Sequence, residues 1–77
     1  MYVIQRDGKY NKSIKLFMAD RSKTKSFWWV YTLANIPMLK VFETKEDATR
    51  AASRLKWGNI KVIPLNQAKL IMGYINE

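Results

Sequence analysis

The chain has 77 residues and contains no cysteine and no histidine. These absences exclude disulfides, zinc sites built from Cys or His, thiol nucleophiles, and nucleophiles that are activated by a neighbouring histidine. The six carboxylates offer little in their place, because Glu46 and Asp47 are adjacent on an expected helix and their side chains diverge. We therefore predict a protein that is not an enzyme and that uses no metal and no cofactor.

Glycine and proline are also scarce, with three and two residues. With 48% hydrophobic and 26% charged residues, the composition is typical of an ordered globular chain, and residues 1–77 are enough for a single domain. The amino terminus carries charge within its first seven residues and has no long apolar run. We therefore predict no signal peptide, no membrane association and a cytoplasmic location.

Acidic residues are outnumbered, since 14 Lys and Arg stand against six Asp and Glu and give a net charge of +8. This density of positive charge favours a polyanion or an acidic protein surface as partner, although it can also serve solubility alone. Residues 1–26 hold a net charge of +5. Their basic residues are Arg6, Lys9, Lys12, Lys15, Arg21, Lys23 and Lys25.

Three segments in the first half of the chain have the composition of strands. Residues 2–6 are β-rich, and Asp7 and Gly8 after them favour a tight hairpin turn. From Ser13 onward, side chains alternate between two faces, so residues 13–19 predict a second strand. After a polar loop over 20–26, the aromatic segment 27–32 predicts a third strand.

Alternation within the third strand separates Trp28 from Trp29. One of the two is therefore expected to face away from the core, where a ring can stack on a base or anchor an interface, although such residues more often belong to the core. Residues 33–42 have no clear period and contain Pro37, so we expect a bend with a short extended end.

A helix is predicted over residues 45–56. Thr44 and Asp47 nearly match a capping box, and Gly58 offers a left-handed end. A narrow stripe of small and apolar residues predicts close packing on a sheet. The stripe consists of Ala48, Ala51, Ala52 and Leu55. Trp57 is expected to cover the core beside it.

Residues 59–65 predict a fourth strand, and because Pro64 near its end cannot donate to a ladder, that end is expected at a sheet edge or beyond the pairing. Asn66 is expected to cap a short helix over 66–76, which needs docking or a partner because Gly73 weakens it. Its apolar stripe is either a core face, the interpretation we favour, or a homodimer interface. This stripe consists of Leu70, Ile71, Tyr74 and Ile75.

These segments together predict an α+β fold. The expected sheet is small and antiparallel, a three-stranded meander plus a fourth strand, with one packed helix and a short C-terminal helix.

The order of these segments resembles a class of small uncharacterised bacteriophage and prophage proteins. Those proteins begin with a Y-V-I strand and a Gly-containing hairpin, and continue through a Trp-containing strand to an F-x-T-x-E-x-A helix and a V-x-V-type strand. Residues 2–65 follow that order. The resemblance implies a viral or mobile-element accessory protein that acts in the host cytosol.

The helix start also resembles the arm-type DNA-binding domain of phage tyrosine integrases. That domain is a three-stranded sheet followed by a helix that opens with F-x-T-K-x-E-A, and the matching positions here are Phe42, Thr44, Lys45 and Ala48. In that family the sheet enters the major groove, so this resemblance implies DNA binding.

Two functions remain open at this point. The first is binding of DNA or RNA through the basic sheet and hairpin face, with aromatic support from the third strand. Its expected site residues are Arg6, Lys9, Lys12, Lys15, Arg21, Lys23, Lys25, Trp28 and Trp29. The second is a phage-type inhibitor or adaptor that binds an acidic host protein of defence, replication or transcription through an aromatic and basic surface.

Overall fold

The computed structural model describes residues 1–8, 10–56 and 59–75. A four-stranded antiparallel sheet forms the centre of the molecule, with strand order β3-β2-β1-β4. The strands are β1 (Tyr2–Asp7), β2 (Lys15–Met18), β3 (Trp29–Val30) and β4 (Lys61–Pro64). The helices are η1 (Leu33–Met38), α1 (Lys45–Ala52), α2 (Leu65–Leu70) and η2 (Ile71–Ile75). The prediction of an α+β fold with a meander, a fourth strand and two helical regions is confirmed.

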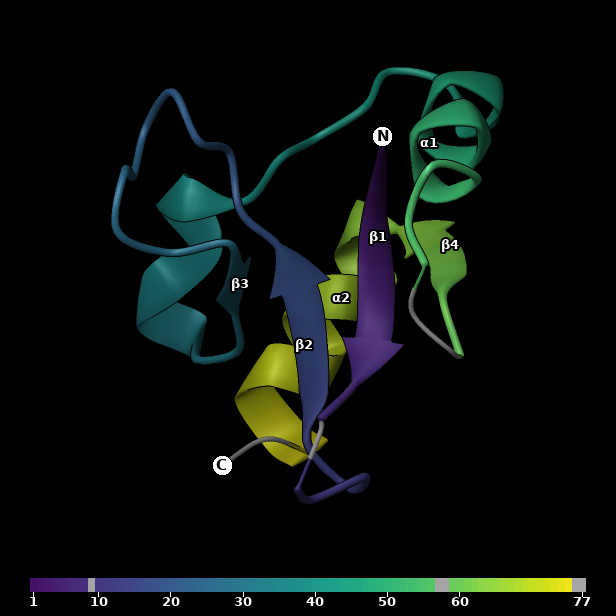
Figure 1. Cartoon of the computed structure of the whole chain (residues 1–77). Helices are drawn as coiled ribbons and strands as arrows, with labels where there is room; N and C mark the ends of the chain where they lie inside the picture. The colour runs from purple at the N-terminus through teal and green to yellow at the C-terminus, as the bar shows by residue number, and fades with distance from the viewer. Residues whose placement is uncertain (9, 57–58, 76–77) are drawn as a thin grey trace.

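Strand pairing assigns each side chain to one of two sheet faces. Val3 lies opposite Ile63, and Gln5 lies opposite Phe17. We call this the core face, because α2 and η2 pack over it from behind the sheet in Figure 1. The buried cluster beneath them consists of Val3, Phe17, Ala19, Val30, Leu39, Ile63, Ala68 and Met72.

The second sheet face is covered by α1 over part of its width. This helix packs against β1 and β4, and Ala48 on its inner side is fully buried. The Thr44 hydroxyl accepts a hydrogen bond from the Asp47 amide at 3.1 Å, as the predicted cap requires. Both the start of the helix at residue 45 and its close packing on the sheet are confirmed.

The predicted end of this helix at residue 56 is wrong, because α1 ends at Ala52. The Ser53 hydroxyl donates to the Arg50 carbonyl at 2.7 Å, and such side-chain bonds compete with helix continuation. Leu55 consequently lies beyond the helix and is half-buried. The predictions for Gly58 as helix end and for Trp57 as cover of the core lie outside the described residues.

The tight turn expected at Asp7 and Gly8 is also wrong, because residues 8–14 join β1 to β2. The Gly8 amide donates to the Ile14 carbonyl at 2.8 Å, and the Ile14 amide donates to the Asn11 carbonyl at 3.2 Å. A Cβ atom at position 8 would lie 2.5 Å from the Asn11 carbonyl oxygen. Glycine is needed here for close backbone approach.

The third strand is shorter than the predicted range of 27–32, and the expected bend after it contains a helix. Ordered pairing holds only Trp29 and Val30. Thr32 then starts η1, with its hydroxyl donating to the Asn35 side-chain oxygen at 2.6 Å and the Asn35 amide donating to the Thr32 carbonyl at 2.9 Å. Pro37 fits inside η1 because a short 3-10 turn makes few backbone bonds.

The C-terminal helix is present and docked, but its predicted cap is wrong, and its predicted stripe is a core face at Ile71 and not at Leu70 or Tyr74; the homodimer interface stays a prediction. Its cap is Pro64, because the helix leaves directly from the end of β4. This start directs Ala68 and Met72 into the core, while Leu70 and Tyr74 are 59% and 82% exposed. Ile71 is half-buried against the core, and the Ile75 side chain lies outside the described part of the chain.

Candidate nucleic-acid interface

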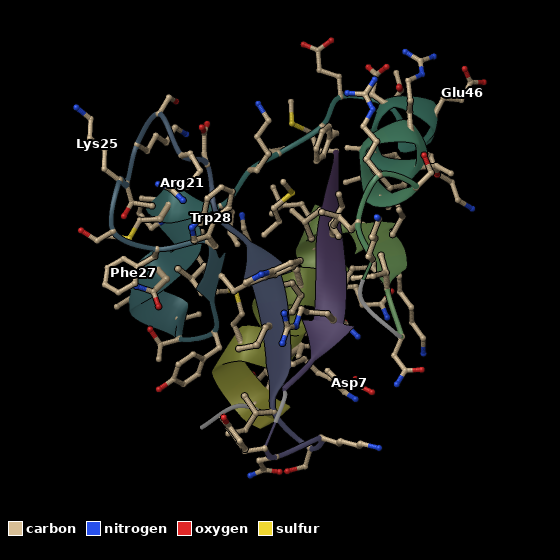
Figure 2. The ribbon with its side chains drawn as sticks, viewed as in Figure 1. Asp7, Arg21, Lys25, Phe27, Trp28 and Glu46 are labelled. Atoms are coloured by element: carbon tan, nitrogen blue, oxygen red, sulfur yellow. The ribbon has the colours of Figure 1, made fainter. Side chains whose placement is uncertain are left out.

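The structure does not gather the nine predicted site residues on one surface. Lys12 lies in the turn that follows β1, and Lys15 begins β2 at that same end of the sheet. Arg21, Lys23 and Lys25 belong to the loop over residues 20–28, at the far end of β2 (Figures 1 and 2). Lys9 lies outside the described residues. The expected single basic face is therefore divided between two ends of the molecule.

Lys15 forms an ion pair that compensates its charge. Its ammonium lies 2.6 Å from a carboxylate oxygen of Asp7, the residue directly opposite on β1. The hydrogen bond from Lys15 holds the pKa of Asp7 below its ordinary value. Because its charge is compensated in this way, Lys15 is a weaker candidate for a phosphate contact than Lys12, Lys23 or Lys25.

Among the described residues, part of the second sheet face beside α1 is left uncovered. Because Arg6 lies opposite Leu16 and Met18 lies opposite Trp29, these four side chains are on that second face, next to the part on which α1 packs. Leu16, Met18 and Trp29 are half-buried, and Arg6 is 7% exposed. We call the area of Arg6, Leu16, Met18 and Trp29 the open half-face.

Two hollows meet at Arg6 on the open half-face. The first has a volume of about 420 Å³ and the second about 310 Å³. The first is lined by Arg6, Met18, Trp28, Trp29 and Leu55. The second is lined by Arg6, Gly8, Tyr10, Asn11, Ile14, Leu16 and Tyr31. Arg6 lines both hollows, and we call this pair of hollows the Arg6 groove; its lining is mainly apolar and aromatic.

Arg6 lies at the centre of this groove and is fixed by contacts on β1 and β3. Its guanidinium carbon lies 5.1 Å from the centroid of the Trp29 ring, within the range of a cation–π interaction. Its Nε donates to the Asp7 carbonyl at 3.3 Å. The groove thus has a positive charge in its floor, held against an aromatic ring.

The loop over residues 20–28 is ordered by its own hydrogen bonds. Asp20 accepts from the Ser22 amide at 3.0 Å and the Ser22 hydroxyl at 2.7 Å, and the Arg21 guanidinium donates to the Lys25 carbonyl at 2.9 Å. The bonds from Ser22 lower the pKa of Asp20. Thr24 is buried inside the loop, and Lys23 and Lys25 remain exposed at its tip.

This loop presents Trp28 at the rim of the Arg6 groove. The Arg21 guanidinium carbon lies 3.8 Å from the centroid of the Trp28 ring, and Figure 2 shows the two side chains together. Trp28 is nevertheless 65% exposed. The prediction that one of the two tryptophans is exposed is confirmed, and that residue is Trp28.

The alternation expected for Trp28 and Trp29 is wrong, because both line the same hollow. Trp28 lies where the loop joins β3, and its carbonyl accepts a hydrogen bond from the Ala19 amide at 2.9 Å. Met18, Leu55, Tyr10 and Tyr31 also line the groove and were missed. The alternating pattern of residues 13–19 placed Met18 on one face, but only the strand pairing shows that this face is open.

The electrostatic setting of the groove is positive. Among the described residues that line the two hollows, none has a carboxylate. Figure 2 shows Asp7 and Glu46 away from the loop that carries Arg21, Lys25 and Trp28. Within residues 1–8, 10–56 and 59–75, no three acidic side chains lie close enough together to hold a metal ion.

No protein-family model, curated protein or solved structure matches the chain. A search for membrane spans among the described residues finds no helix with the length and apolar character to cross a bilayer.

Proposed function

We propose that this protein is a non-enzymatic nucleic-acid-binding protein whose contact surface is the Arg6 groove with the loop over residues 20–28. The observation that carries this proposal is the pairing of Trp28 and Trp29 over an uncovered sheet face in a chain of net charge +8. Aromatic rings on a sheet can stack on bases, and surrounding cations can contact the phosphate backbone.

The proposal assigns separate roles to the rings and the cations. Lys23 and Lys25, exposed beside Trp28, contact phosphates at one end of the groove, and Lys12 does so at the other. Trp28 and Trp29 contact bases between them. The resemblance of the helix start to an integrase DNA-binding domain supports this function.

Protein docking is the second candidate, and the apolar lining of the 420 Å³ hollow favours it. Trp28, Trp29, Met18 and Leu55 could receive an apolar anchor from a protein partner, as hot-spot pockets do. The cations around the hollow would then select an acidic surface, such as that of a host protein bound by a phage-type inhibitor.

A salt titration with fluorescently labelled DNA tests the proposal. Replacing Lys23 and Lys25 with Ala should reduce the slope of log affinity against log salt by about two units, because each lost phosphate contact removes about one. The matched control replaces Lys61 and Lys69 with Ala. It makes the same change in net charge, but Lys61 pairs with Gln5 on the core-face side and Lys69 lies on α2.

The control should keep the original slope. If the unmodified protein shows no binding at about 50 mM salt and tens of micromolar, nucleic-acid binding is wrong. Capture from host lysate with and without nuclease would then test the docking function, which requires one saturable partner that survives nuclease.

A further inference from the structure

We infer that the nucleic acid bound in the Arg6 groove is single-stranded, with one unstacked base lying on the open face of Trp28. This inference rests on the proposed function and specifies its ligand. Three features of the molecule support it: the surroundings of Trp28, the aromatic rings that line the groove, and the charges on the elements that project from the sheet.

Trp28 has one covered ring face and one open ring face. Arg21 stacks on the first at 3.8 Å, yet 65% of the residue is exposed, so the second face is accessible. Because Arg21 is itself tied to the Lys25 carbonyl, the ring is held in place before any ligand arrives. A fixed ring loses little conformational entropy when a base stacks on it.

The charge behind Trp28 favours a phosphate close to the stacked base. The Nε and Nη1 atoms of Arg21 are buried and have no hydrogen-bond partner among the described residues. No carboxylate there neutralises this guanidinium, and Lys23 and Lys25 lie in the same loop. Because these Arg21 atoms are buried, the phosphate of a base stacked on Trp28 would contact the exposed side chains of Lys23 and Lys25.

Further rings continue along the groove from Trp28. Trp29 lines the first hollow, and Tyr31 and Tyr10 line the second, with Arg6 between them. Base faces are hidden inside the stack of a duplex, whereas bases of a single strand can be splayed onto aromatic side chains. The rings that line the groove can therefore stack on the bases of a single strand, but they cannot reach the base faces of a duplex.

The elements that project from the sheet lack the surface expected of a duplex reader. A protein enters the major groove with a helix or a two-stranded ribbon. On α1 the exposed Glu46 and Asp47 offset the exposed Lys45 and Arg50, and Arg50 lies 3.8 Å from an Asp47 carboxylate oxygen. At the β1–β2 turn, Lys15 is already paired with Asp7. Neither element offers an unbroken basic surface among the described residues.

The test compares three labelled probes, namely a 12-nucleotide oligo-dT, a 12-nucleotide oligo-rU and a 12-base-pair duplex. We expect both single strands to bind at least about tenfold more tightly than the duplex, since only they offer free base faces. Trp28→Ala should weaken single-strand binding about 5- to 150-fold, the loss expected for one stacked base, without changing the salt slope. Trp28→Phe should retain most of the affinity.

The matched control is Tyr74→Ala. Tyr74 is an exposed ring on η2, on the far side of the sheet, so its loss should leave all affinities unchanged. Comparison of the oligo-dT and oligo-rU affinities shows whether the strand is DNA or RNA, and either outcome supports a single-stranded ligand.

Two results would overturn the inference while leaving nucleic-acid binding intact. One is a duplex affinity equal to or above that of the single strands, and the other is a Trp28→Ala variant that binds like the original. Absence of binding to all three probes would instead overturn the proposed function.

Discussion

Neighbouring side chains on the same strands differ in burial between the two faces of the sheet. On β1, Val3 is fully buried beneath α2, whereas Arg6 lines a groove that no helix of the described residues covers. On β2, Phe17 is fully buried, while its neighbour Met18 lines that groove. The second face buries Ile4 and Ala48 where α1 packs on it, and only its open half-face is left available to carry rings and charge.

Truncation of two neighbouring side chains on β2 should give the largest difference in stability between the two faces. Phe17→Ala should lower the free energy of unfolding by about 3–5 kcal/mol, because it leaves a cavity in the core. Met18→Ala, one residue away on the open half-face, should cost about 1 kcal/mol. Urea denaturation followed by circular dichroism measures both. Equal losses would show that the two faces do not differ in their contribution to stability.

Alanine substitutions of two glycines should change the stability by smaller amounts, and the two changes should have opposite signs. Gly8→Ala places a Cβ atom 2.5 Å from the Asn11 carbonyl oxygen, so the turn must shift, and a loss of about 1–3 kcal/mol is expected. Gly73→Ala on η2 meets only Leu33 Cδ1 at 3.8 Å and should stabilise the helix by up to about 1 kcal/mol. If the melting temperatures of both variants shift in the same direction, the predicted opposite effects of the two substitutions are wrong.

The smallest change in stability is expected on lowering the pH. The pKa of Asp7 is lowered by its hydrogen bond from Lys15, and the pKa of Asp20 by its bonds from Ser22. Because the folded-state pKa is lowered, each carboxylate contributes its full stabilisation above the ordinary pKa of 3.8. This stabilisation is lost as the pH falls through the lower pKa of the folded state. Thermal unfolding between pH 6 and pH 2 should show a modest loss that Asp7→Asn reduces. An unchanged loss in Asp7→Asn would exclude the pair with Lys15 as a source.

Much of the fold could be predicted because local patterns determine it. Alternation over residues 13–19, the cap at Thr44 and the alanine stripe predicted β2 and the start of α1, since each pattern acts within a few residues. The inward face of α2 could not be predicted in the same way. Its rotation is set by direct attachment to β4, and that constraint becomes visible only when the strand is in place.

The candidate site was harder to predict, for a related reason. The site residues were predicted because they are basic or aromatic, and three of them, Arg6, Trp28 and Trp29, lie together. Their association depends on which half of one sheet face α1 leaves uncovered, and this depends on strand order. The lysines were grouped because they are close in sequence, yet β2 separates them by its whole length.

Strand order also sets the sequence of events in folding. β1 lies between β2, which follows it after a short connection, and β4, whose Pro64 pairs with Tyr2. The pairing with β2 closes a small loop, whereas the pairing with β4 must close nearly the whole chain and carries a larger entropic cost. During synthesis, one edge of β1 therefore stays without its partner until β4 has been made, and in that interval it is open to pairing with other chains.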